Sequence, residues 1–448
     1  MKDIYSQKLH KLIPGGAHTY SRGDDQFPYN APSILEKGEG AYVYDPQGNK
    51  FLDYGMGLRS VNIGYGNKEI ADACYDEIIK GNNLTRASVT ELKAAELLVD
   101  LIPSIDMVKF AKHGSTVTTA AVKLARAYTN RKYIAVPYEQ PFFSFDDWFI
   151  GSTVMTKGTL EETSNFTLKF HYNDIESLQQ LFDNYKGQIA GVIIEAATTL
   201  KPCSSQCDSE KCNECPNNDS NFLQKVQKVC KENEAVFILD EMITGFRWAL
   251  KGAQTFYNID PDLCTFGKAM ANGQAVAALG GKAEIMKLGG ILDGGAERVF
   301  LTSTTHGAEM SALGAFIKTI EIMKRDNVIE HYWSYGEKLI NGMNELSRKH
   351  GLENFFYVEG YPCSPNYITK DKEGVVSLAF RTLFAQSMMD KKVMMPYIAV
   401  SFSHKEEELE ITLSAVNYAL DIYKKALENG YEKYLKSDII KPVFRKYN

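Results

Sequence analysis

The sequence predicts an α/β fold: a large α/β/α domain with a mostly parallel sheet, and a small α+β domain formed by both termini. The first observation is a repeated order of strand, helix and strand between residues 107 and 240. The second is the last third of the chain, where long helical periods replace the short apolar runs. The third is the length of 448 residues, since chains of this size commonly form more than one domain.

The N-terminal segment, residues 1–60, predicts short strands. Residues 33–36 and 41–44 have strand-like composition, and the turn Asp45-Pro-Gln-Gly48 precedes a third piece at 51–53. Such short strands need a partner, so we expect this segment to pack with the small domain.

Residues 61–325 predict the large domain. Apolar side chains recur with helical spacing at 68–80, 89–101, 116–129 and 220–232. Short apolar runs typical of buried strands occupy 107–111, 134–137, 191–195 and 235–240.

Residues 326–448 predict the C-terminal part of the small domain. Helices are expected at 307–324, where the large domain ends, and at 330–349 and 405–427. Strands are expected near 375–380 and 398–402.

Charge and hydropathy narrow the class of function. A net charge of -6 and a pI near 5.9 argue against binding of nucleic acid or a membrane surface. The sequence shows no apolar run of the roughly 18 residues that span a bilayer, and no secretory signal. We therefore expect a cytoplasmic protein.

The first chemical motif is His113-Gly-Ser-Thr116, between a predicted strand and a predicted helix. Free backbone N–H groups, hydroxyls and the positive helix end would together face an anion. A plain helix cap is the alternative for this motif taken alone.

The second motif is the carboxylate that ends an apolar strand, Asp240. Ligands of α/β sheets bind at the carboxyl ends of strands, where an aspartate can hold a proton on a pyridine nitrogen. The alternative is an aspartate that caps the next helix.

The third motif is Lys268 within Thr265-Phe-Gly-Lys-Ala-Met-Ala-Asn-Gly273. Its small neighbours would let a planar group approach the backbone, and its amine could form an imine. The alternative is a solvated loop lysine.

With these motifs in the same order, the chain resembles the class III aminotransferases, which are fold-type I enzymes dependent on pyridoxal phosphate (PLP). Within that family it is most similar to the glutamate-1-semialdehyde 2,1-aminomutase branch. The matching segments are IPGGAHTYSRG (13–23), EGAYVYDPQGNKFLDY (39–54), VKFAKHGSTVTTAAVKLARAYTNR (108–131), AVFILDEMITGFR (235–247), DLCTFGKAMANG (262–273), STTHG (303–307) and VSFSH (400–404).

The resemblance implies specific roles for these residues. Lys268 would form the Schiff base with PLP and move the proton, and Asp240 would contact the pyridinium nitrogen. Gly114 and Ser115, with Thr116, would bind the phosphate. Thr304 would reach the phosphate of a neighbouring subunit, which implies a homodimer with shared sites.

The resemblance also implies an aromatic ring on the cofactor face. Phe142 takes that position after a shift of one residue, with packing in the core as the alternative. Phe143 takes the place of a family histidine. These departures from the family put the family's hydrogen bonds at this place in doubt.

The substrate residues follow from the same resemblance. Arg22 matches an arginine that binds a substrate carboxylate, with a solvated surface arginine as the alternative, and Arg59 is a second candidate for an anion. Glu195 ends a strand where the family commonly reads Glu-Pro, whereas this chain reads Glu-Ala. We therefore expect a substrate different from that of the aminomutase.

A hydrophilic insertion at residues 201–218 carries Cys203, Cys207, Cys212 and Cys215. Four thiolates so close together predict a structural zinc site, with four free surface thiols as the alternative.

The predicted activity is therefore amino transfer from an amino acid donor to an aldehyde or keto acceptor, one that is anionic and sugar-like or a semialdehyde. An intramolecular aminomutase is the alternative within the family. A non-catalytic, zinc-stabilised binding protein is the alternative from another class.

Overall fold

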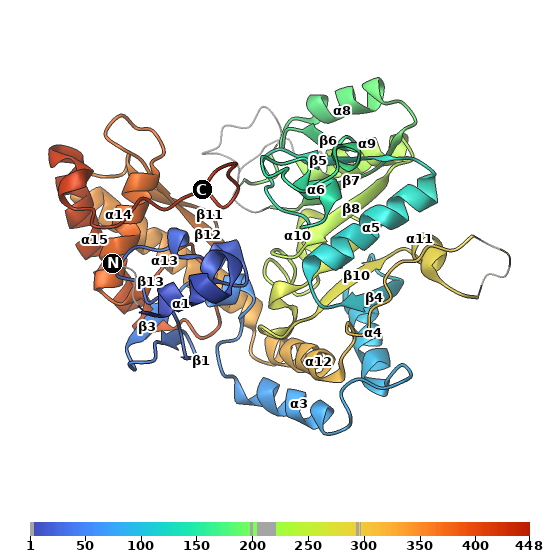
Figure 1. Ribbon diagram of the computed structural model, residues 1–448, viewed down its shortest axis with the longest axis horizontal. Coiled ribbons are helices and arrows are strands. Elements are labelled where there is room, and N and C mark those ends of the chain that lie inside the picture. The colour runs from blue at the N-terminus through green and yellow to red at the C-terminus, as the bar shows by residue number, and fades with distance from the viewer. Residues whose placement is uncertain (1–3, 198–199, 204–220, 293–294, 296) are drawn as a thin grey trace. The chain divides into compact units, whose positions relative to one another are not determined.

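The computed structural model describes residues 4–197, 200–203, 221–292, 295 and 297–448. The chain divides into two compact units (Figure 1). The small unit comprises Met1–Lys68 and Asn327–Val443, and the large unit comprises Glu69–Asp326 and Phe444–Asn448. Within the described ranges, no helix has the length and apolar character needed to cross a membrane.

The large unit is built on a sheet of seven strands, counted over the described residues, in the order β4-β10-β9-β8-β7-β5-β6. Strands β9, β8, β7, β5 and β6 are parallel, and β10 runs antiparallel between β4 and β9. The sheet is therefore mostly parallel, as predicted. Its strands are β4 (Met107–Ala111), β5 (Tyr133–Pro137), β6 (Thr167–Phe170), β7 (Ile189–Glu195), β8 (Val236–Glu241), β9 (Leu263–Phe266) and β10 (Ala277–Gly281).

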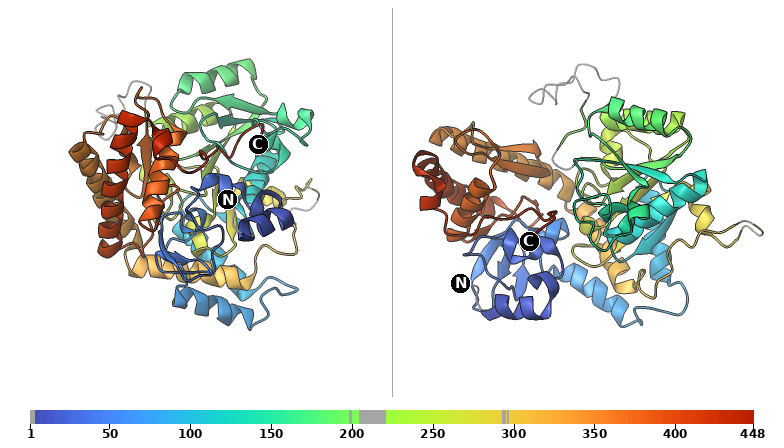
Figure 2. Two further views of the ribbon diagram at one scale, coloured as in Figure 1. Left: turned by 60° about the vertical axis from the view of Figure 1, so that its left-hand side comes forward. Right: turned by 45° about the horizontal axis from the view of Figure 1, so that its top comes forward.

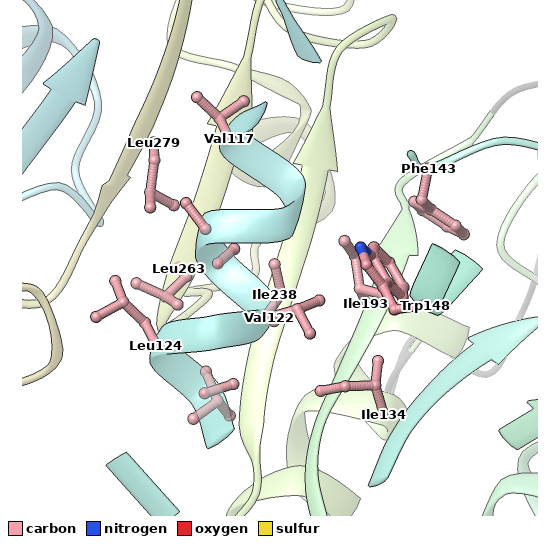
Figure 3. Packing of buried hydrophobic residues seen from close by; sticks show 14 of the residues in the cluster. Val117, Val122, Leu124, Ile134, Phe143, Trp148, Ile193, Ile238, Leu263 and Leu279 are labelled. Atoms are coloured by element: carbon pink, nitrogen blue, oxygen red, sulfur yellow. The ribbon is translucent and has the colours of Figure 1, made fainter. Parts of the chain in front are cut away.

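Helix α5 (Gly114–Thr129) packs across one face of this sheet. Figure 3 shows Val122 and Leu124 of the helix facing strand residues that include Ile238 and Leu263. All four side chains are buried. Burial of one such side chain contributes about 1.5–3 kcal/mol, so this layer holds the strand ends in place.

Helix α9 (Phe222–Glu232) packs on β8. It begins with a capping box, in which Asn221 and Gln224 each accept the other's backbone N–H. The other helices of this unit are α3 (Lys68–Ile78), α4 (Val89–Leu101), α6 (Asp147–Ile150), α7 (Glu161–Ser164), α8 (Ile175–Asn184), α10 (Ala253–Tyr257), α11 (Ala283–Met286) and α12 (Met310–Arg325).

The small unit combines segments from both ends of the chain. Its larger sheet has the order β1-β2-β3-β13, and β13 (Val393–Met394) pairs in parallel with β3 (Lys50–Asp53). The prediction of a small α+β domain formed by both termini is therefore confirmed. Its other elements are α1 (Ile4–Leu12), β1 (Lys37–Glu39), β2 (Tyr42–Tyr44), α2 (Met56–Arg59), α13 (Val328–His350), β11 (Phe356–Tyr361), β12 (Ser364–Thr369), α14 (Leu378–Asp390) and α15 (Glu406–Asn429).

Two strand predictions in this unit were wrong. Residues 375–380 lead into α14 instead, because Ser377 caps the helix and accepts the backbone N–H of Phe380 at 3.4 Å. Residues 398–402 lie outside the strands, and their backbone makes isolated bonds, such as Ala399 N to Tyr54 O at 2.9 Å. Apolar composition alone could not distinguish these cases from strands.

A buried histidine joins the two chain segments of the small unit. The backbone N–H of Ser401 donates to Nδ1 of His404 at 3.0 Å, so the ring proton sits on Nε2 and donates to the carbonyl of Asp53 at 3.1 Å. The ring stacks on Tyr54 at 4.4 Å. Burial lowers the pKa of His404 to about 4, so the residue is neutral.

Candidate functional site

Three parallel strands of the large unit end in one row of polar side chains. Glu195 of β7 pairs in register with Asp240 of β8, and Asp240 pairs with Thr265 of β9. All three residues are buried. The row lies at the carboxyl ends of the strands, the edge at which α/β sheets bind ligands.

Asp240 is held in place through one of its two carboxylate oxygens. Its Oδ1 accepts the backbone N–H of Met242 and the hydroxyl of Thr265, each at 2.9 Å. Both hydrogen bonds that it receives from described residues end on Oδ1, so Oδ2 remains for a ligand. Burial raises the pKa of Asp240, and these two donors together with the charge of Lys268 oppose that rise.

Lys268 follows β9 at the same edge. It opens a short 3-10 turn (Lys268–Ala271) with φ of +40°, a conformation that a non-glycine residue adopts at a cost of about 1–3 kcal/mol. Its neighbours Ala269, Met270 and Ala271 are buried. The turn thus places an amine close enough to influence the carboxylate of Asp240.

The residues predicted to bind a phosphate, Gly114, Ser115 and Thr116, are here called the phosphate cradle. They form the start of α5. The helix begins at Gly114, two residues earlier than predicted, so Gly114, Ser115 and Thr116 all lie in its first turn. No acidic side chain lies in that turn to neutralise the positive helix end. The buried Ser115 accepts the backbone N–H of Phe145 at 3.2 Å, and no group among the described residues accepts its hydroxyl proton.

Met242 is a site residue that the sequence reasoning missed. A Cβ on Gly114 would lie 2.9 Å from its sulfur, and a Cβ on Gly267 would lie 2.7 Å from it. The thioether therefore lies against both the cradle and the lysine turn, and each glycine leaves room for it. Its position two residues after the strand-end Asp240 was the available signal.

The two phenylalanines after β5 have different environments. Phe143 is 2% exposed and packs edge to face on Phe149, with ring centroids 5.5 Å apart. Phe142 is 45% exposed and leaves much of its surface open. Phe143 is therefore a core residue, and stacking of Phe142 on a cofactor stays a prediction.

Thr304 lies in an exposed loop that is anchored beside the cradle. Its hydroxyl donates to the carbonyl of His306 at 2.6 Å. The buried Glu309 accepts the backbone N–H of Gly307 at 3.0 Å and pairs with Lys112, also at 3.0 Å. Burial opposes ionisation of Glu309, but the pairing with Lys112 outweighs it and lowers the pKa. Sequence reasoning missed this anchor.

Arg22 and Arg59 belong to the small unit. Arg22 is exposed and ends the 3-10 turn Tyr20–Arg22. Arg59 ends α2, in which all four residues have φ between +40° and +66°. Its guanidinium donates to Ser364 Oγ at 2.9 Å and lies 4.9 Å from the ring of Tyr397. The guanidinium of Arg59 thus already has partners within the small unit, and its binding of an anion stays a prediction.

The cysteine insertion lies largely outside the described residues, which include Cys203 but not Cys207, Cys212 or Cys215. The backbone N–H of Cys203 donates to Asn173 Oδ1 at 2.9 Å. Over the part of the chain that the structure describes, no group of three His, Cys, Asp or Glu side chains could hold a metal. The zinc site stays a prediction.

Comparison with known proteins agrees with this geometry. The family model of class-III aminotransferases matches residues 20–360. The chain is 31% identical over 430 residues to a glutamate-1-semialdehyde 2,1-aminomutase of Francisella philomiragia, covering 91% of this chain and 95% of the relative. It is also 31% identical over 427 residues to a 3-aminobutyryl-CoA aminotransferase of Cloacimonas acidaminovorans, covering 94% of this chain and 97% of the relative.

Solved structures show the same fold. The FumI protein of Sphingopyxis sp. MTA144, solved with PLP, superposes with a TM-score of 0.82 at 24% identity, covering 95% of this chain and 97% of that one. An omega-transaminase of Sphaerobacter thermophilus superposes with a TM-score of 0.79 at 22% identity, covering 93% of this chain and 96% of that one. With the sequence match and this fold together, the chain belongs to the class-III aminotransferase family of PLP-dependent enzymes.

Proposed function

We propose that this aminotransferase moves an amino group from an amino acid donor to an aldehyde or keto acceptor that carries an anionic group. One observation supports the catalytic part of the proposal: Lys268, Asp240 and the first turn of α5 all lie in the large unit. Met242 lies against Gly114 in that turn and against Gly267, which precedes Lys268. The proposal that the acceptor is anionic rests on Arg22, which is exposed in the small unit.

The residues present fit PLP. Gly114 and Ser115 would bind its phosphate through backbone N–H groups and a hydroxyl at a helix end without acidic side chains. Asp240 keeps Oδ2 for a ring N–H, because its two other donors use Oδ1. Lys268 supplies the amine. When bound, PLP supplies an electron sink for the negative charge that develops on the substrate's α-carbon.

The chain's own groups would then perform the proton work. Lys268 would take the proton from the α-carbon of the donor, from a turn that follows β9 at the carboxyl ends of the strands. Asp240 must be ionised to hold a protonated ring nitrogen. The hydroxyl of Thr265 and the N–H of Met242 favour that ionised form against the effect of burial.

Thr304 and the exposed apolar side chains support a homodimer. Thr304 is exposed in a loop anchored next to the cradle, where it could reach a partner's phosphate. Large apolar side chains are exposed on α3, on the connection to α4 and on the first turn of α4: Tyr75, Ile78, Ile79, Leu84, Val89 and Leu92. A second copy of the chain would cover such a surface. A cytoplasmic location and a zinc-bound cysteine insertion stay predictions from the sequence.

Spectral titration tests the proposal. The purified protein with PLP is mixed with L-glutamate or L-alanine, and then with succinic semialdehyde as the acceptor. We expect the visible band of the bound cofactor to fall with a donor, one equivalent of keto acid to appear, and the band to return with the acceptor. A protein whose band stays unchanged with every amino donor is not an aminotransferase.

The same assay separates the aminomutase alternative, which the relative from Francisella philomiragia supports. An aminomutase converts glutamate 1-semialdehyde without net release of a keto acid. A colourless protein that takes up no PLP would instead favour the non-catalytic alternative.

A further inference from the structure

The chain after α15 folds back over the segment that carries Arg22. We name residues 434–441 the C-terminal strap. The backbone N–H of Lys441 donates to the carbonyl of Asp25 at 3.0 Å, and Gln26 Nε2 donates to the carbonyl of Lys441 at 2.9 Å. Both views in Figure 2 show the blue N-terminal and dark red C-terminal segments side by side. The strap therefore holds Asp25 and Gln26, the third and fourth residues after Arg22.

A third hydrogen bond extends this contact along the strap. The backbone N–H of Tyr29 donates to Ser437 Oγ at 2.8 Å. The strap thus touches the N-terminal segment at two places, residues 25–26 and residue 29. Movement of the strap would release both.

Gln386 on α14 fixes the strap. Its Oε1 accepts the backbone N–H groups of Lys436 at 2.8 Å and Ser437 at 3.2 Å. Its Nε2 donates to the carbonyl of Tyr434 at 3.0 Å. The amide is buried, so both of its ends depend on the strap for hydrogen bonds. One turn earlier, Thr382 Oγ1 accepts the N–H of Ile440 at 3.0 Å.

The strap and Arg22 line one cavity of about 930 Å³ within the small unit. Arg22 contributes to its wall together with Ser437, Asp438 and Lys441 of the strap. In the described part of the chain, no side chain or backbone group forms a hydrogen bond or ion pair with the Arg22 guanidinium, so it is available to an anion. A ligand held by Arg22 would therefore lie in a cavity that has the strap as part of its wall.

We propose that the C-terminal strap determines acceptor specificity, and that Gln386 is a positioning residue that acts through the strap on Arg22. The inference rests on the proposed function, in which Arg22 meets the anionic group of the acceptor. A strap that served stability alone would contribute equally to the reaction with a charged and with a neutral acceptor.

Hydrogen exchange tests the physical link without any activity. Gln386→Met keeps the length of the side chain and removes its hydrogen bonds. Ser387→Ala is the matched control, because Ser387 is buried on the same helix and donates only to Leu383 O, at 2.8 Å. We expect Gln386→Met to speed exchange in peptides covering 434–441 and 20–26, and the control to leave both unchanged. Unchanged exchange at 20–26 would overturn the inference.

Kinetics test the consequence with succinic semialdehyde as the anionic acceptor and butanal as its neutral counterpart. We expect Gln386→Met to raise KM for succinic semialdehyde roughly tenfold, as loss of a few neutral hydrogen bonds allows, with kcat changed less than about threefold. KM for butanal should stay the same. In an Arg22→Ala background, the further increase from Gln386→Met should fall below about twofold, because the two residues act as a unit.

Equal losses with both acceptors, or additive effects in the double variant, would overturn the proposal. A wild-type protein that shows no band change with any amino donor would count against the proposed function instead. A wild-type protein that reacts with donors but aminates neither aldehyde would overturn the proposal. If the proposed function fails, the exchange at 20–26 decides whether Gln386 positions Arg22.

Discussion

The hydroxyl of Thr265 donates to Oδ1 of Asp240 at 2.9 Å, between residues that are paired in register on adjacent parallel strands. This bond and the one from the backbone N–H of Met242 both end on Oδ1, so Oδ2 remains for the proposed contact with the cofactor. It also favours the ionised carboxylate, whose pKa burial raises.

Thr265→Val should therefore raise the pKa of Asp240 further. The ionised form would then be reached only at higher pH, so the acid limb of kcat/KM should move up by about one pH unit. The measurement is the pH profile of the donor half-reaction. Thr265→Ser keeps the hydroxyl and should retain the wild-type profile. Superimposable profiles for the Val and wild-type proteins would contradict the assignment.

Lys268→Ala should abolish amino transfer, lowering the rate by at least about 10³-fold, because the proton transfer loses its amine. Borohydride reduction of the wild-type protein with PLP should attach the cofactor to the peptide containing Lys268, detected by mass spectrometry. Lys251→Ala, at an exposed lysine of the same unit, serves as control and should retain both properties. Attachment at another lysine would disprove the role of Lys268.

Gly267→Ala should weaken PLP binding roughly tenfold or more, because the new Cβ would lie 2.7 Å from the sulfur of Met242. The measurement is the dissociation constant for PLP. Met242→Ala removes the opposing atoms, so the double variant should bind PLP more tightly than Gly267→Ala alone. If the second change gave no recovery, Met242 would not be the contact that requires glycine.

Acid should destabilise the small unit through His404. Its pKa is about 4 in the folded chain, below the ordinary value of 6.5, so its contribution is complete above pH 6.5 and is lost as the pH falls toward 4. His404→Gln should flatten the fall of the urea midpoint between pH 6.5 and 4.5. His350→Gln, at a half-buried histidine of the same unit, is the control. Parallel pH dependences of the His404 variant and the wild type would contradict this account.

The cysteine insertion should hold about one zinc ion per chain, since four thiolates complete a tetrahedral site. Metal analysis of the purified protein measures the ratio, and Cys212→Ser should lower it. Because such a site is structural, amino transfer should survive removal of zinc by a chelator. A wild-type protein without zinc would leave the alternative of four free thiols.

The positions of the residues proposed for catalysis could be predicted from the sequence because each residue lies next to a regular element. Asp240 ends an apolar strand, Gly114 opens a helix, and Lys268 follows a strand in a turn of small residues. Short-range patterns specify such positions. The residues that support them, Met242, Thr265 and Glu309, depend on contacts between elements far apart in the chain. Apart from the position of Met242 two residues after Asp240, no local pattern indicates those contacts.

The small unit was harder to predict for the same reason. Residues 398–402 bond with single backbone groups of the N-terminal segment, such as Tyr54 and Asn62, rather than with a neighbouring strand. Their apolar composition is shared by both arrangements. No sequence pattern predicted the strap, because its partner Gln386 lies about 50 residues away in the chain.

The pairing of Glu195, Asp240 and Thr265 makes the length of β8 more important than its composition. One apolar residue can replace another there with a modest loss of stability. Insertion or deletion of a single residue ahead of Asp240 would turn its carboxylate to the opposite face of the sheet. The protein could remain folded and still lose its cofactor, so homologues that keep the chemistry should tolerate substitution in this strand but not a change in its residue count.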